Sequence, residues 1–462
     1  MLQARVLIRL ERPREALRLL LAHGQPADPA LAAERNVVLG LAQGLTHDFE
    51  AGLSSIESAS GSDAPRDVQA DALYFAATIH WMRRDNASAE AALRELRTFD
   101  NPNDRARACA LQAWIAIGRQ DMEEHVRLLI AALDQFEAAG ADADVYHFAR
   151  ALDTLASVCR EVHHPEVAQR VRRLSESLPW TDSLVQYRAA ILRSFGWIDA
   201  LDGNTIASFR AFKEAAALAP SAPFRLLATL DRAFLAQATG EQLFADDLLA
   251  DAISLGDRIQ WENVLESERI ALPVLALLTA DVDPAAAVSY LSHYRTLQGS
   301  ARSLTISRDV RIEAFMSLAA GIARAKLGDT KEAERLLADA WSLLNAFSCE
   351  WRAALAAYHL FRVTGLPKWR EIARQNIREY PRSWLFAEIQ ASSGAPESAP
   401  RLTPVQQQVF DELCKGASTN AIAQHLNRSP NTVRNHISDI FELFGVRTRA
   451  ELLTLAHKLS RK

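Results

Sequence analysis

The sequence predicts an all-α protein made of two parts, and its composition gives the first reason. Of the 462 residues, 49% are hydrophobic, whereas there are only 18 glycines and 17 prolines. The alternation of β-branched and polar residues that marks strands is almost absent, and a chain rich in Leu and Ala favours helices. A chain of this length is too long for a single hydrophobic core, so we expect several domains.

A recurring phrase gives the second reason. A polar turn with Gly, Asp, Asn or Pro ends one helix, and the next begins with an acidic residue and Ala before an apolar pair. Clear copies are Glu11–Leu20 and Gly328–Leu337. The second helices are expected to begin near residues 14, 48, 87, 121, 165, 205, 241, 284, 330 and 368. This spacing of about 34 to 46 residues is typical of helical solenoid repeats.

Residues 1–390 resemble tetratricopeptide repeats, in which stacked helix pairs bury their apolar faces against their neighbours. The resemblance implies about ten helix pairs, one for each second helix expected above. Their stack would form a concave surface that serves as a sensor or interaction domain. Its effector would be a peptide, a protein or a small molecule. Aromatic groups on first helices, at 74–75 and 146–148, could line a pocket or form the core between repeats. We favour the core.

No common catalytic motif is present. The sequence lacks the phosphate loop GxxxxGK[ST] and also GxGxxG, GxSxG and HExxH, so we expect no enzyme, no catalytic residue, no cofactor and no metal. The four cysteines (Cys109, Cys159, Cys349 and Cys414) lack metal-ligand spacing and are interpreted as buried thiols of a reducing cytosol. No apolar run reaches the roughly 20 residues of a membrane span, and no signal peptide is evident. A cytoplasmic protein without membrane contact is therefore expected.

Charge divides the chain unevenly. Residues 401–462 carry 9 Lys and Arg against 5 Asp and Glu, whereas the whole chain has a net charge of −5. A basic tail on an acidic body suggests that the tail contacts a polyanion. Residues 391–400 separate the two parts and read Ala-Ser-Ser-Gly-Ala-Pro-Glu-Ser-Ala-Pro. Because this stretch has no apolar periodicity, it is predicted to be a flexible linker.

Four short helices are predicted in residues 401–462. The first begins at a capping box formed by Thr403 and Gln406, and the third begins with Ser429 as N-cap and Pro430 as first residue. The second begins near Ser418, the third spans 430–444 and the fourth spans 449–459. In the third helix, one arc about 100° wide is apolar, and Asn431, Arg434, Asn435 and Ser438 lie on the other side. Alone, this helix could equally be an ordinary surface helix.

Its neighbours make the pattern specific. The phrases Leu402-Thr403-Pro404, Gly416-Ala417-Ser418, Ser429 to His436 and Phe444-Gly445-Val446 resemble the LuxR/FixJ-type DNA-binding domain without a gap. The resemblance implies a small four-helix domain that contains a helix-turn-helix. In such a motif the first helix crosses the DNA backbone and the second, here 430–444, reads the major groove.

The resemblance also implies roles for individual residues. Arg434, Asn435 and Ser438 would face bases, and Asn431 lies on the same edge. Thr419, Asn420, Thr432 and His436 would lie near phosphates, although His436 could instead only brace the helix. Acidic Asp439 and Glu442 repel phosphate, so the remaining contacts are expected from Arg428, Arg447 and Arg449. Helix 449–459 would form a homodimer contact, which matches a two-fold dimer to paired half-sites.

We therefore expect a LuxR-type transcriptional regulator that binds double-stranded DNA and senses an effector through its repeats. It would be found in the cytoplasm and with the bacterial nucleoid when bound to DNA. The alternative is a tetratricopeptide-like adaptor whose tail domain contacts protein.

Overall fold

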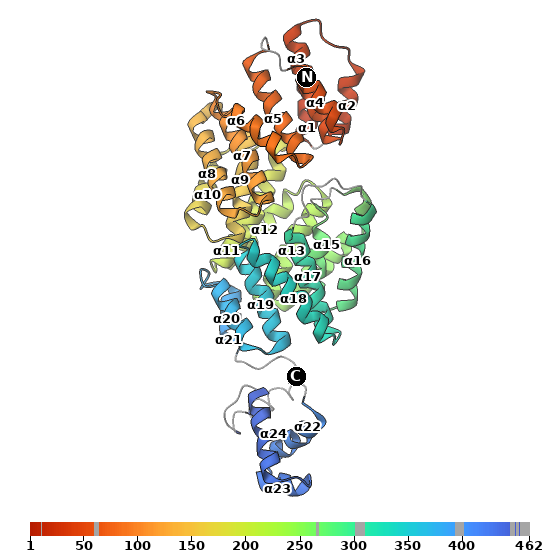
Figure 1. Ribbon diagram of the computed structural model, residues 1–462, viewed down its shortest axis with the longest axis vertical. Coiled ribbons are helices and arrows are strands. Elements are labelled where there is room, and N and C mark those ends of the chain that lie inside the picture. The colour runs from red at the N-terminus through yellow and green to blue at the C-terminus, as the bar shows by residue number, and fades with distance from the viewer. Residues whose placement is uncertain are drawn as a thin grey trace.

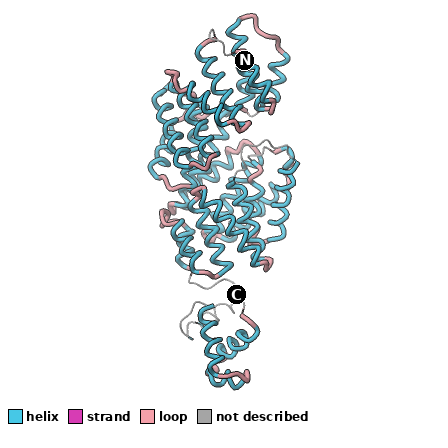
Figure 2. Tube along the Cα trace, viewed as in Figure 1, coloured by secondary structure: helices cyan, strands magenta, loops and turns pink. Residues whose placement is uncertain are grey.

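The computed structural model describes residues 1–10, 12–59, 64–264, 268–300, 310–392 and 402–443, together with Arg449 and Leu452. Within these residues the regular structure is entirely helical, as Figures 1 and 2 show. The predicted all-α fold class is confirmed. No helix in the described ranges is long and apolar enough to cross a membrane.

Consecutive helices pack as pairs along most of the chain. The described ranges contain ten pairs: α1 (Leu2–Arg9) with α2 (Pro13–Ala22), α3 (Pro29–Leu45) with α4 (Phe49–Glu57), α5 (Arg66–Met82) with α6 (Asn86–Leu96), α7 (Pro102–Gly118) with α8 (Met122–Ala139), α9 (Val145–Glu161) with α10 (Pro165–Ser177), α11 (Val185–Leu201) with α12 (Thr205–Ala217), α13 (Ala222–Ala238) with α14 (Gln242–Gly256), α15 (Ala271–Thr279) with α16 (Pro284–Ser300), α17 (Val310–Lys326) with α18 (Thr330–Ala346), and α19 (Glu350–Thr364) with α20 (Pro367–Asn376). Each second helix begins within one residue of its predicted start, which confirms the tetratricopeptide-like solenoid.

The turn inside several pairs has one recurring geometry. A residue with positive φ precedes an aspartate that caps the second helix, and Asp85 shows how. Its N–H donates to the His80 carbonyl at 2.8 Å, and its carboxylate accepts from Ser88 N at 3.1 Å. The first bond closes the preceding helix and the second caps the next. The positive-φ residues are His47, Arg84, Gln120 and Gly328.

The solenoid packs tightly and curves back on itself. A Cβ at Gly40 of α3 would lie 2.5 Å from the carbonyl oxygen of Gly52 in α4, so this pair needs glycine at the crossing. Farther along, the superhelix brings α19 against α9. Trp351 Nε1 donates to the Arg160 carbonyl at 3.0 Å, although 191 residues separate them. The last pairs therefore contact the middle of the array.

The aromatic groups of the first helices form core. Tyr74 and Phe75 are 7% and 8% exposed, and the ring of His147 packs edge-on against Tyr74 with centroids 5.3 Å apart. This supports the core interpretation of these aromatic groups. Cys109, Cys159 and Cys349 are buried as expected, but Cys414 is exposed. That expectation was wrong for Cys414, which lies at the outer end of a helix in the small C-terminal group.

After α21 (Trp384–Ala391) the described chain resumes with three short helices. They are α22 (Pro404–Cys414), α23 (Thr419–His425) and α24 (Pro430–Leu443), drawn in blue beyond the repeats in Figure 1. Most of the predicted linker, residues 393–400, lies outside the described residues, as does most of the predicted fourth helix.

Candidate nucleic-acid interface

The three C-terminal helices share a small core of their own. Val409 and Leu413 of α22, Ile422 and Ala423 of α23, and Val433 and Ile440 of α24 are buried together with Leu452. Phe410, Ile437 and Phe441 pack partly buried around them. The apolar arc predicted for the third helix therefore faces this core. Phe444, the last residue of the predicted helix 430–444, lies outside the described residues.

Local hydrogen bonds fix how the helices meet. The predicted capping box of α22 is present, with Gln406 N donating to Thr403 Oγ1 at 3.3 Å and Thr403 N donating to Gln406 Oε1 at 3.0 Å. At the other end, Gly416 adopts φ 89° and Ala417 N donates to the Glu412 carbonyl at 3.1 Å. This closure ends α22 and turns the chain into α23.

The turn between α23 and α24 repeats this device without glycine. Asn427 adopts φ 50°, and Arg428 N donates to the Ala423 carbonyl at 2.9 Å. Asparagine tolerates this left-handed conformation better than most residues. Ser429 then caps α24, because its Oγ accepts from Thr432 N at 3.1 Å. Because these hydrogen bonds close both helix ends across a tight turn, α24 is held at one angle to α23.

The polar face of α24 is turned to solvent. Asn431, Arg434, Asn435 and Ser438 are exposed, on the side opposite the fully buried Val433 and Ile440. Arg434 Nη1 donates to Asn431 Oδ1, a neighbour one turn earlier. The face thus offers guanidinium and hydroxyl donors with amide groups that can donate or accept, the groups that read base edges.

The residues expected near phosphates lie around this face at different depths. Asn420 is exposed at the start of α23, and Thr419 and Thr432 are half-buried. His436 is also half-buried, and its Nδ1 is buried without a hydrogen-bond partner among the described residues. One edge of the imidazole therefore faces the domain, which favours the bracing role left open for it.

The flanking arginines differ in their surroundings. Arg428 is exposed in the turn before α24. Arg449 Nη2 donates to the Leu413 carbonyl at 2.9 Å, in the last turn of α22. The same carbonyl also accepts from Gly416 N at 3.1 Å, so Arg449 adds a second donor at the end of α22 and has a structural contact in addition to its expected role. Arg447 lies outside the described residues.

Two polar features of the domain were not anticipated from the sequence. The structural bond of Arg449 has no local signal, because it joins residues 36 positions apart. The left-handed Asn427 could have been found, since Asn directly after an apolar helix is a recognised stop signal. Exposed Asp439 supports the expectation that the second half of α24 is less favourable to phosphate. The side chain of Glu442 is not described.

Comparison with known proteins agrees with this geometry. Residues 400–456 match the bacterial regulatory proteins of the luxR family. Over 55 residues the chain is 40% identical to the spore germination protein GerE of Bacillus subtilis (strain 168), which is 12% of this chain and 74% of that relative.

Two solved helical-repeat structures align with the larger part of the chain. A Rap protein complexed with competence and sporulation factor is 13% identical with a TM-score of 0.42, over 80% of this chain and 96% of that one. The TPR domain of P58(IPK) is 14% identical with a TM-score of 0.19, over 78% and 99%. Because both TM-scores are low, the repeat assignment rests on the helix pairs themselves.

Proposed function

Since this chain belongs to the luxR family of bacterial regulatory proteins, we propose that it is a sequence-specific transcriptional regulator that reads the DNA major groove with α24. The observation that carries the proposal is the exposed polar face of this helix, opposite a stripe packed into the domain core. On that face Arg434, Asn435 and Ser438 contact bases, with Asn431 beside them. A helix presenting such donors and acceptors fits the major groove, where every base pair has a distinct pattern.

Phosphate contacts flank this reading edge in the proposal. The DNA backbone is contacted by Thr419 and Asn420 at the start of α23 and by Thr432 in the first turn of α24. His436 either contacts a phosphate beside them or only braces α24. Arg428, Arg447 and Arg449 supply positive charge on both sides. In α22, Glu412 pairs with Lys415 at 2.9 Å, and Asp411 accepts a hydrogen bond from Gln407 at 2.8 Å.

The proposed domain boundaries are those that the sequence predicts. Residues 1–390 form the repeat domain, 391–400 the linker and 401–462 the DNA-binding domain. Helix 449–459 makes the dimer contact on paired half-sites, which places two copies of α24 in successive grooves. The regulator acts in the cytoplasm on nucleoid DNA and is not an enzyme. The repeats sense a peptide, a protein or a small molecule.

Genome-wide mapping of bound DNA with the full-length protein tests this function. We expect a limited set of sites that share a two-fold motif, and an affinity for them that falls steeply with salt as phosphate counterions are released. Affinity that stays constant between low and physiological salt would exclude DNA as the partner. A stable protein partner in pull-downs, with no protected DNA, would instead favour the adaptor function.

A further inference from the structure

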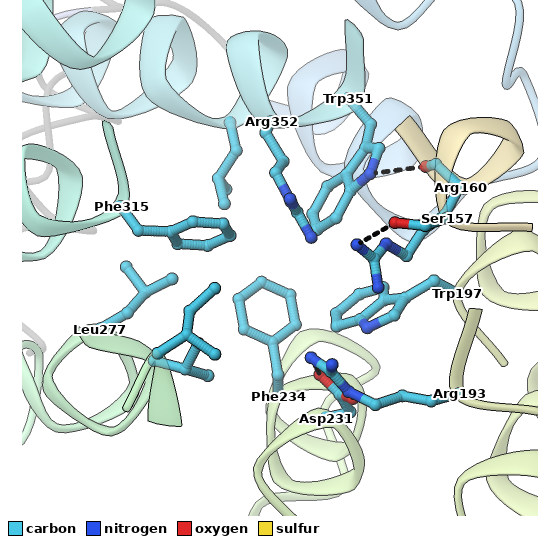
Figure 3. A pocket seen from close by; sticks show the side chains of 13 residues that line it. Ser157, Arg160, Arg193, Trp197, Asp231, Phe234, Leu277, Phe315, Trp351 and Arg352 are labelled. Carbon is cyan, nitrogen blue, oxygen red and sulfur yellow. Dashed lines mark hydrogen bonds and ion pairs between the residues drawn. The ribbon is translucent and has the colours of Figure 1, made fainter. Parts of the chain in front are cut away.

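Charged groups on the inner side of the solenoid are paired within the fold. A cavity of about 100 Å³ there is lined by residues of first helices, from α9 to α19 (Figure 3). Arg193 Nη2 donates to Asp231 Oδ1 at 3.3 Å, and Arg352 Nη1 lies 2.8 Å from Glu161 Oε1. These inner charges belong to the fold. The second helices, which form the outer side of the repeats, carry charges of a different kind.

The outer side of the sixth and seventh helix pairs exposes two large apolar side chains. Ile206 of α12 is 79% exposed and Leu243 of α14 is 86% exposed, the two highest values among the described large hydrophobic residues. Each is the second residue of its helix. The rings of Phe209 and Phe244 lie 5.8 Å apart, so the starts of α12 and α14 are side by side. Ile206 and Leu243 therefore belong to one area of the outer surface.

Exposed positive charge follows Ile206 along α12. Arg210 and Lys213 lie four and seven residues after it, so the three side chains form one stripe on the helix. Neither cation has an ion-pair partner in the part of the chain that the structure describes. The acidic residue of this helix, Glu214, is engaged by Arg188 at 3.1 Å. The outer stripe of α12 is thus apolar at its start and basic beyond it.

Exposed negative charge follows Leu243 along α14. This helix carries Asp246, Asp247 and Asp251 but no lysine or arginine, and all three carboxylates are exposed. Asp247 lies four residues after Leu243, the same spacing that separates the apolar residue from the arginine on α12. It has no ion-pair partner among the described residues. The outer stripe of α14 is thus apolar at its start and acidic beyond it.

The two stripes are complementary to each other, as a two-fold contact between identical chains requires. As second helices of consecutive pairs, α12 and α14 run in the same direction. A two-fold axis that lies parallel to them, in the plane of the contact, places α12 of each chain over α14 of the other. Ile206 then meets Leu243, and Arg210 meets Asp247, and each of these contacts occurs twice.

We propose that the outer faces of α12 and α14 form a homodimer contact, with a second copy of this chain as the occupant. Charge complementarity selects this occupant, because a uniformly basic partner would be repelled by Arg210 and Lys213, and a uniformly acidic one by Asp246 and Asp247. The contact joins the repeats of two chains. It goes beyond the contact proposed for helix 449–459 and does not depend on DNA binding.

Sedimentation analysis of the full-length protein without DNA tests this contact. We expect a monomer–dimer equilibrium whose dissociation constant rises with salt, because exposed charge pairs are screened. Arg210→Glu and Asp247→Arg each place like charges opposite each other twice, so each should weaken dimerisation at least tenfold. The matched control is Lys331→Glu on α18, which reverses an exposed cation outside the contact and should dimerise like the wild type.

A mixture of the two variants provides the decisive measurement. In a mixed pair, the introduced glutamate of one chain faces the introduced arginine of the other, and the unchanged Arg210 and Asp247 face each other. We expect the mixture to dimerise nearly as well as the wild type, which also shows that both variants are folded. A mixture that stays monomeric would overturn the proposal. So would wild-type protein without any dimer, or dimers that each variant retains by itself.

The apolar pair is tested without changing a charge. Leu243→Ser should raise the dimer dissociation constant, because it removes apolar area that the contact buries twice. Leu327→Ser, at a residue that is 54% exposed in the turn before α18, is the matched control and should leave dimerisation unchanged. Equal dissociation constants for Leu243→Ser and Leu327→Ser would exclude Leu243 from the contact and overturn the proposed arrangement.

Discussion

Arginines in the helical repeats and in the C-terminal helices have different partners. In the repeats, Arg107 is 8% exposed and contacts Asp71 at 2.7 Å and Asp104 at 2.5 Å. On α24, Arg434 is exposed, and its partner is the neutral amide of Asn431. The side chain of Arg428 is exposed too and pairs with no carboxylate in the described part of the chain.

The difference shows how one residue type serves two purposes. A guanidinium taken out of water needs carboxylates around it, because the desolvation penalty is several kcal/mol per ion. An exposed guanidinium carries no such requirement and remains available to phosphate. Burial together with a carboxylate partner therefore marks an arginine of the fold, and composition alone cannot separate the two kinds.

Removing a buried arginine should have the largest effect. In Arg107→Met, Asp104 loses its ion pair with the guanidinium, and Asp71 keeps its ion pair with Arg5 at 2.7 Å. We expect the free energy of unfolding of the first repeats to fall by about 3–5 kcal/mol, the range for breaking a buried ion pair. Chemical denaturation followed by circular dichroism measures this loss.

The control for that variant is Arg335→Gln, whose ion pairs with Glu332 and Asp339 are exposed. Exposed pairs of this kind contribute about 0–1 kcal/mol. If both variants lower the denaturation midpoint equally, burial does not distinguish the arginines of the repeats.

Changing the exposed arginine of α24 should affect DNA and not stability. Arg434→Ala is expected to weaken binding to the cognate site by about 1–3 kcal/mol, the contribution of a bidentate base contact. Arg434→Lys keeps the charge without the two-pronged geometry, so it should lose specificity while keeping affinity for unrelated DNA. Gel shifts on cognate and scrambled DNA sites separate a loss of specificity from a general loss of affinity. Parallel losses on both DNAs would mean that Arg434 contacts phosphate.

Features encoded locally could be predicted from the sequence. The Gly328-Asp329 turn, the capping box of Thr403 and Gln406, and the buried positions Val433 and Ile440 all depend on neighbours within about one or two helical turns. That is why the starts of the second helices and the solvent face of α24 agree with expectation. The same holds for the core role of Tyr74 and Phe75.

Features that depend on superhelical geometry could not be predicted. The bond from Trp351 to the Arg160 carbonyl joins helices 191 residues apart, and small rotations between successive pairs determine whether they meet. The ion pair between Arg352 and Glu161, at 2.8 Å, follows from the same curvature. Cys414 was misjudged for a different reason, since a short helix in a small domain leaves one of its faces to solvent.

A carboxyl group on α9, that of Asp153, predicts a pH effect on the repeats. Burial raises the pKa of Asp153 to about 7, so ionising this acid opposes folding. Its stabilising contribution is complete below the unfolded pKa of about 3.9 and is lost as the pH rises through about 7. Between pH 5 and pH 8, wild type should lose about 2–3 kcal/mol relative to Asp153→Asn.

Thermal melts of both proteins across this pH range measure the difference, with exposed Asp339→Asn as the matched control. Parallel curves for wild type and Asp153→Asn would mean that nearby Arg160, Arg150 and Arg193 keep Asp153 ionised.

The smallest effect is expected at the start of α24, where fold and proposed function meet. Ser429→Ala removes the acceptor of the Thr432 N–H, an N-cap contribution of about 1 kcal/mol. Faster amide exchange at Thr432 and Val433, measured by mass spectrometry on the full chain, should report the frayed turn. Ser429→Asn retains a capping oxygen and is the matched control. Because Asn431 and Arg434 lie within the same two turns, fraying should also weaken DNA binding slightly; unchanged exchange with weakened binding would instead assign Ser429 to the DNA.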